Sequence, residues 1–168
     1  SVAFGCPDQG DVPVTSVVDV VKRFRDLGCD EIGIADTIGV GNAEQVKRVL
    51  EAAAREYPIG QISGHFHDTY GQAIANVYAS LQVGVARFDT SIAGLGGCPY
   101  AKGATGNVAT EDVLFLLNGL GIETGIDLER MVDTGQWISA FLGRKSMSRA
   151  GNALFAKQQS RDEQSATA

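Results

Sequence analysis

Apolar and polar positions along the chain follow a pattern typical of strands that alternate with helices. Residues 1–5 form a short apolar run, and residues 11–28 then carry apolar side chains at every third or fourth position before Gly28. This spacing predicts a strand and then an amphipathic helix. The pattern recurs, with strands expected over residues 30–37, 59–69 and 85–91 and helices over residues 42–50, over residues 70–84 and from Thr110 onward. The sequence therefore predicts four strand–helix units.

The ends of two helices are marked by their residue types. Asn42 is suited to begin the second helix, and Gln45 occupies the position three residues later that completes a capping box. Gly84 is expected to end the third helix.

The C-terminal part is predicted to be helical and then disordered. Residues 127–143 and a short stretch near Ala150 have a helical pattern, whereas residues 156–168 are polar and contain few apolar side chains. Such a composition buries too little apolar surface to fold by itself. We therefore expect one domain over residues 1–155, followed by a disordered tail over residues 156–168.

Strands that alternate with helices favour an α/β fold with parallel strands. The short connections suit either an open sheet or a TIM (β/α)8 barrel, which contains eight such units in about 250 residues and has its active site at the C-terminal ends of the strands. The chemically interesting side chains lie at or just after these strand ends: Cys6, Asp36, His65, His67, Asp89 and Cys98.

Composition narrows the choice of ligand. The 168 residues are 44% hydrophobic and 20% charged, which is typical of one globular domain. A net charge of -6 and scattered Lys and Arg residues argue against nucleic acid and favour a small molecule. Three irregularly spaced cysteines predict reduced thiols and a cytoplasmic location. The sequence shows no secretion signal and no apolar run approaching the roughly 20 residues that span a membrane.

Both histidines of the chain lie in the segment GHFHDTYGQ, two residues apart. Residues two apart on a strand point to the same face, so His65 and His67 would present two imidazoles for one divalent cation. The alternative is one core histidine and one exposed histidine, and the pattern alone does not separate the two interpretations. Asp68 could orient a ring, but we favour a role as a cap of the following helix.

Asp36 ends the second predicted strand and has two possible roles. It could be a ligand or an acid–base group, or its carboxylate could bind the backbone of the following turn, and the spacing favours the turn. A dinucleotide-binding loop is excluded here, because Glu44 occupies the position of the third glycine.

The segment from Ile92 to Asn107 contains five glycines and Cys98. A connection of this length predicts a mobile active-site lid. The Cys98 thiol could then act as a general acid or a nucleophile, or could simply fill space beside Pro99. Asn107 would be either a metal ligand or an ordinary residue near a helix start.

Four segments together resemble the 3-hydroxy-3-methylglutaryl-CoA lyase family: FGCPDQG, ADTIGVG, HFHDTYGQAIAN and AGLGGCPYAKGATGNVATEDV. The resemblance runs from Ser1 to roughly Leu142, and the cysteine loop GGCPYA separates the chain from related isopropylmalate and homocitrate synthases. It implies a TIM barrel that cleaves hydroxymethylglutaryl-CoA to acetoacetate and acetyl-CoA with Mg²⁺ or Mn²⁺. The acyl-CoA substrate is a small molecule, and we also expect a homo-oligomer.

The resemblance also implies roles for individual residues. His65, His67 and Asn107 match the residues that hold the cation, and Cys98 matches a catalytic acid–base on the lid. Asp36 matches a residue implicated in catalysis, and Glu111 matches a further candidate near the site.

The family's first strand carries an Asp-Arg-Glu motif, and no strand of this sequence begins with that motif. The resemblance therefore implies the C-terminal half of the barrel, either as a fragment or from a truncated gene, with little or no activity alone. Two alternatives stay open: a related synthase that condenses an acyl-CoA with a 2-oxo acid, and a half-barrel that only binds metal.

Overall fold

The computed structural model describes residues 1–97 and 106–166. Contacts between residues divide the chain into two compact units. The first unit comprises Ser1–Asp89 with Gly97–Asn107, and the second comprises Thr90–Gly96 with Val108–Ala168. The single domain that the sequence predicts over residues 1–155 stays a prediction.

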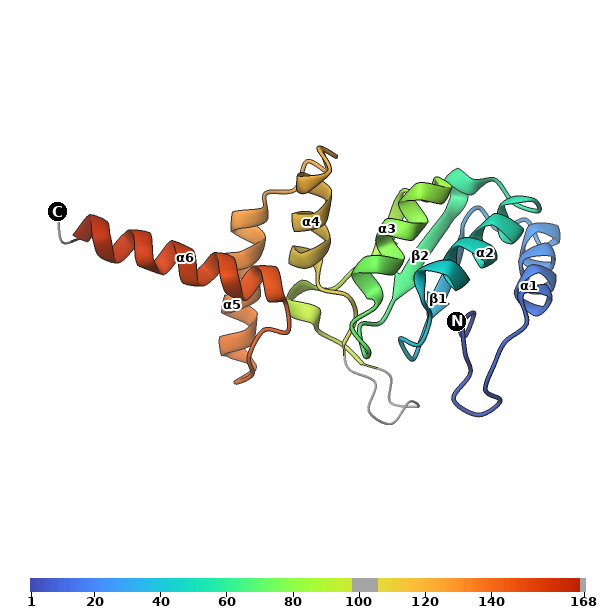
Figure 1. The fold of residues 1–168 in the computed structure, drawn as a ribbon, viewed down its shortest axis with the longest axis horizontal. Helices are drawn as coiled ribbons and strands as arrows, with labels where there is room; N and C mark the ends of the chain where they lie inside the picture. The colour runs from blue at the N-terminus through green and yellow to red at the C-terminus, as the bar shows by residue number, and fades with distance from the viewer. Residues whose placement is uncertain (98–105, 167–168) are drawn as a thin grey trace. The chain divides into compact units, whose positions relative to one another are not determined.

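The first unit is built around a parallel sheet, which confirms the α/β class. Its strands are β1 (Ile32–Asp36), β2 (Ile62–Phe66) and β3 (Arg87–Asp89), in the order β1-β2-β3. Its helices are α1 (Val14–Asp26), α2 (Ala43–Ala54) and α3 (Ala73–Val83), with a short 3-10 turn, η1 (Ile59–Gln61), before β2. Helix α2 packs between α1 and α3, and α3 packs against β2 (Figure 1).

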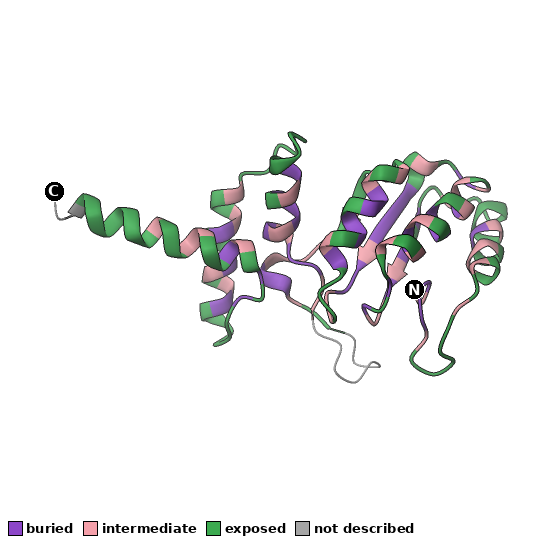
Figure 2. Ribbon diagram, viewed as in Figure 1, coloured by how far each residue is buried: buried purple, intermediate pink, exposed green. Residues whose placement is uncertain are grey.

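One face of the sheet belongs to the core and the other carries the polar groups. Ile32, Ile34 and Asp36 alternate along β1 and are buried, whereas Gly33 between them is exposed. Figure 2 shows buried residues along β2 and on α2 and α3. Parallel pairing aligns Ala35 with His65 and His65 with Asp89, so these three residues share the less covered face at the C-terminal ends of the strands.

The predicted helix ends are confirmed. Asn42 accepts a hydrogen bond from the Gln45 amide and the Gln45 side chain accepts one from the Asn42 amide, which completes the capping box of α2. Gly84 ends α3 with a φ of 105°, a conformation that side chains disfavour.

The second unit is helical. It contains a 3-10 turn, η2 (Ile92–Gly94), and the helices α4 (Thr110–Gly119), α5 (Leu128–Phe141) and α6 (Arg149–Ala166). Helices α4, α5 and α6 pack against one another, and η2 packs against α4 and α5. The helix expected from Thr110 begins there.

Two segments differ from the sequence-based expectations. Residues 1–5 form no regular strand; Val2 makes one isolated bridge to Asp36 and Ala3 donates to the Ala35 carbonyl, which leaves too few contacts for a ladder. Helix α6 extends to Ala166, through most of the segment expected to be disordered. Its Lys, Gln, Arg, Glu and Ala residues have high helix propensity, so a solvated helix forms without burying an apolar face.

Candidate active site

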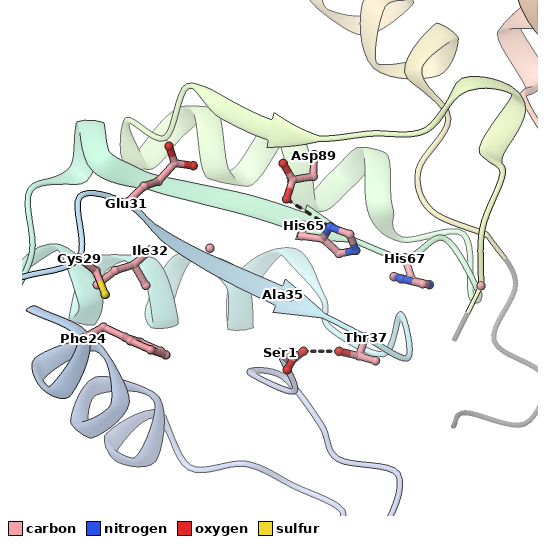
Figure 3. Close-up of a pocket in the computed structure, with 12 residues that line it drawn as sticks. Ser1, Phe24, Cys29, Glu31, Ile32, Ala35, Thr37, His65, His67 and Asp89 are labelled. Atoms are coloured by element: carbon pink, nitrogen blue, oxygen red, sulfur yellow. Dashed lines mark hydrogen bonds and ion pairs between the residues drawn. The ribbon is translucent and has the colours of Figure 1, made fainter. Parts of the chain in front are cut away.

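His65 lies near the C-terminal end of β2 and His67 directly follows the strand, so both histidines lie at the strand exit that the sequence predicted. Their ring centroids lie 5.4 Å apart and the rings are tilted by 44°. His65 is partly exposed, whereas His67 is only 6% exposed. The two imidazoles therefore form one pair at the strand exit, with one member near the surface and one in the interior (Figure 3).

Asn107 is held beside His67 by backbone contacts. The two residues form an antiparallel bridge, and the amide of Asp68 donates to the Gly106 carbonyl at 3.2 Å. The predicted ligands His65, His67 and Asn107 are thus brought to one region of the first unit. A shared bound cation is not tested by these contacts and stays a prediction.

The histidine pair borders an open cleft of about 660 Å³ within the first unit. Figure 3 shows the labelled lining residues, which come from the N-terminal segment, α1 and all three strands. Gly33 contributes backbone and Ala35 a small side chain to the wall, and Phe24 and Ile32 contribute larger apolar side chains. The cleft thus combines apolar walls with a few polar groups, which is typical of a small-molecule site.

A carboxylate also contacts the pair. Asp89 at the end of β3 lies with Oδ2 3.3 Å from Nδ1 of His65. The sequence placed Asp89 at a strand end but did not pair it with His65. The parallel register that aligns the two residues is the signal that could have revealed this contact.

Asp36 has the turn geometry that the spacing favoured. Its side chain is fully buried, and the Oδ1 atom accepts hydrogen bonds from the amides of Gly39 and Val40 at 3.0 and 3.1 Å. The Oδ2 atom accepts from the Gly41 amide at 2.7 Å. Burial raises the pKa of the Asp36 carboxyl, and these three amides together with His67 oppose the increase. Asp36 therefore organises the loop between β1 and α2.

That loop lies against the histidine segment and requires glycine. Gly39 has a φ of 73°, and a Cβ there would lie 2.9 Å from the His67 carbonyl oxygen. A Cβ on Gly41 would lie 2.9 Å from Oδ2 of Asp36. In addition, the His67 amide donates to the Asp36 carbonyl at 3.3 Å. Asp36 is thereby coupled to the backbone position of His67.

Asp68 is a helix cap, as we favoured. Its Oδ1 atom accepts from the amide of Ala73, the first residue of α3, at 2.9 Å. This carboxylate stabilises a helix start, where the macrodipole favours negative charge.

Glu111 lies in the second unit and is only 1% exposed. Both of its carboxylate oxygens lie 3.0 Å from the Ala93 amide nitrogen. Ala93 has a φ of 54° and is the only residue other than glycine with positive φ in the described segments. Burial raises the pKa of the Glu111 carboxyl, the two backbone contacts oppose the increase, and Asp112 adds to it. The carboxylate thus holds an unfavourable backbone conformation in η2.

Cys6 and Cys98 are the two cysteines that the sequence analysis placed at or just after predicted strand ends. Cys98 lies outside the described residues. Cys6 exchanges two backbone hydrogen bonds with Gly10, which closes a turn.

The donor atoms fit a divalent cation. Among residues 1–97 and 106–166, no group of three His, Cys, Asp or Glu side chains is arranged to hold a metal. Two imidazoles and the oxygen of an asparagine nevertheless form a donor set that divalent ions accept. A cation held by His65, His67 and Asn107 would supply Lewis-acid chemistry at this site.

No helix in the described part of the chain is long and apolar enough to cross a membrane.

Comparison with known proteins places this geometry in a family. Residues 1–138 match the HMGL-like family. The chain is 58% identical over 157 residues to a 3-hydroxy-3-isohexenylglutaryl-CoA/hydroxymethylglutaryl-CoA lyase of Pseudomonas aeruginosa. The aligned residues make up 94% of this chain and 52% of that protein. The chain is 48% identical to the human mitochondrial hydroxymethylglutaryl-CoA lyase, across 91% of this chain and 47% of that one.

Solved structures of lyases are similar to this chain in fold. The hydroxymethylglutaryl-CoA lyase of Pseudomonas aeruginosa superposes with a TM-score of 0.88 at 58% identity, across 92% of this chain and 52% of that chain. A lyase of Acinetobacter baumannii in complex with coenzyme A and 3-methylmalate gives 0.87 at 38% identity, across 90% and 50%. The chain spans about half the length of the relatives that it matches, as the predicted half-barrel would. It belongs to the HMGL-like family of TIM-barrel enzymes.

Proposed function

We propose that this chain forms part of a carbon–carbon lyase that cleaves 3-hydroxy-3-methylglutaryl-CoA to acetoacetate and acetyl-CoA. The observation that carries the proposal is the His65–His67 pair at the edge of an open cleft, in a chain 58% identical to a lyase of this class. A small acyl-CoA substrate also agrees with the acidic composition, which argues against a nucleic-acid ligand.

His65, His67 and Asn107 would hold the divalent cation, either Mg²⁺ or Mn²⁺. The cation, when bound, supplies Lewis-acid polarisation of substrate oxygens. The protein's contribution is to fix the donors. The Asp36 loop supports the backbone at His67, and the isolated bridge between His67 and Asn107 fixes the backbone that carries the third donor.

Cys98 is the proposed proton donor. Cleavage requires a base to remove the proton of the tertiary hydroxyl group, whose oxygen becomes the ketone of acetoacetate. The electron pair of the broken carbon–carbon bond passes to the acetyl-CoA enolate, and this carbanion takes a proton from the Cys98 thiol. For Asp36 and Glu111, both buried against backbone amides, the contacts support a positioning role.

A chimaeric enzyme tests the reaction. This chain would replace the matching segment of the Pseudomonas aeruginosa lyase, and the purified chimaera would be supplied with hydroxymethylglutaryl-CoA and Mn²⁺. We expect acetoacetate and acetyl-CoA in equal amounts, and loss of both products in the His65→Ala chimaera. A folded chimaera that fails to cleave, or that condenses acetyl-CoA with a 2-oxo acid, would overturn the proposal in favour of a metal-binding scaffold or a synthase.

A branched substrate with a longer side chain is a second candidate. The observation that favours it is the dual name of the 58% identical relative, which includes 3-hydroxy-3-isohexenylglutaryl-CoA. The ratio of kcat/KM for the two substrates, measured with the same chimaera, separates the candidates. A higher value for the isohexenyl compound would identify the longer substrate.

The purified chain alone is expected to show little or no turnover, because the sequence lacks the Asp-Arg-Glu strand that the resemblance implies for a complete site. Turnover with Mg²⁺ that disappears in Cys98→Ala would contradict this expectation.

A further inference from the structure

We propose that Asp89 is a positioning residue that fixes the proton of His65 on Nδ1 and so presents Nε2 to a divalent cation. The inference rests on the proposed cation site, and it assigns a role to a residue outside the predicted ligand set.

The fold brings the two side chains together. Strands β2 and β3 are parallel neighbours, and their register places His65 opposite Asp89. Aligned residues on adjacent strands project to the same face of a sheet. Asp89 Oδ2 consequently lies 3.3 Å from His65 Nδ1, and Figure 3 shows this contact on one side of the ring with His67 toward the other.

The chemistry of the pair fixes the direction of the hydrogen bond. An ionised carboxylate only accepts hydrogen bonds, so Nδ1 of His65 must carry the proton. In the neutral ring Nε2 is then left with its lone pair, which is the form that binds a metal. A carboxylate behind a ligating histidine both selects this tautomer and orients the ring.

A second carboxylate on the same cleft provides a matched control. Glu31 also lines the cleft, but its Oε2 atom pairs with Arg87 at 2.8 Å. Arg87 lies on β3 two residues before Asp89 and forms an ion pair with Glu31. Glu31→Gln therefore removes the same charge from the cleft without removing the His65 contact.

Nuclear magnetic resonance of the metal-free chain tests the tautomer directly. With only two histidines in the sequence, the ring ¹⁵N signals of His65 can be assigned by comparison with His67→Ala. At a pH where the rings are neutral, we expect the Nδ1–H form of His65 in wild type and in Glu31→Gln. In Asp89→Ala we expect a shift toward Nε2–H, the form favoured in free histidine. A wild-type ring already in the Nε2–H form, or one that Asp89→Ala leaves unchanged, would overturn the inference.

Titration with Mn²⁺, followed by electron paramagnetic resonance of the free ion, separates this inference from the proposed site. Loss of such a carboxylate typically weakens metal binding by about 10- to 100-fold. We expect a weakening of this size in Asp89→Ala, partial recovery in Asp89→Glu, and little change in Glu31→Gln. If His65→Ala weakens binding but Asp89→Ala does not, the Asp89 role is refuted while the proposed site stands. If His65→Ala has no effect, the proposed site itself fails.

Discussion

At the scale of single residues, the local roles of polar groups were harder to predict than their positions. The sequence located Asp36, His65 and His67 at strand ends, because reactive groups follow apolar runs there. It could not decide whether Asp36 faced a ligand or its own turn, since that depends on which amides converge on the carboxylate. The pairing of His65 with Asp89 required the strand register, which joins residues 24 apart.

Asp36→Asn is expected to destabilise the first unit. The carboxylate serves three amides with two oxygens, and an asparagine side chain has only one acceptor oxygen. An unsatisfied buried amide costs about 1–3 kcal/mol, so the free energy of unfolding should fall by about that amount. Urea unfolding of Asp36→Asn beside the exposed control Asp8→Asn measures the difference. Equal stabilities would show that the turn does not depend on the carboxylate.

Glu111→Gln is expected to change how stability depends on pH. Because burial raises the pKa of Glu111, the folded chain binds this proton more tightly than the unfolded chain. The resulting stabilisation is complete below the unfolded-state pKa, near 4.5, and is lost as the pH rises through the folded-state pKa. A glutamine cannot titrate, so the stability of the variant relative to wild type should increase over that range. Urea unfolding at several pH values measures it, and a constant difference would contradict the buried-acid interpretation.

At the scale of elements, local signals predicted where helices begin and end, but they did not predict which segments pair as strands. The Asn42–Gln45 capping box and the Gly84 helix end depend on short-range chemistry, and both were confirmed. Residues 1–5 were expected to be a strand, yet a ladder needs a neighbour that the apolar pattern does not reveal. The helical stretch near Ala150 was predicted, but its extension through the polar residues up to Ala166 was not, because these residues satisfy helix propensity without showing an apolar stripe.

Gly39→Ala should disturb the contact between the Asp36 loop and the histidine segment. Any side chain at this positive φ costs about 1–2 kcal/mol, and here the Cβ would also lie 2.9 Å from the His67 carbonyl oxygen. Gly10→Ala is the matched control, because Gly10 has a similar φ of 78° and no atom within 4 Å of its added Cβ. We expect Gly39→Ala to lower the unfolding free energy more than Gly10→Ala and to shift the ring signals of His67. Equal effects would mean that only the backbone conformation matters.

At the scale of the whole chain, periodicity and strand-end chemistry were sufficient for the fold class, and the motifs were sufficient for the family. The single domain expected over residues 1–155 stays a prediction, while contacts between residues divide the chain into two compact units. The homo-oligomer stays a prediction, and the mass of the purified chain in solution tests it.

We propose that this chain carries the cation site of a lyase. Equilibrium titration of the purified chain with Mn²⁺, beside the variants His65→Ala and His67→Ala, tests for this site. We predict one Mn²⁺ per chain in wild type and at least about 10-fold weaker binding in each variant, because each loses an imidazole donor. Binding that is unchanged in both variants, or absent from the folded wild-type chain, would show that the two histidines hold no cation.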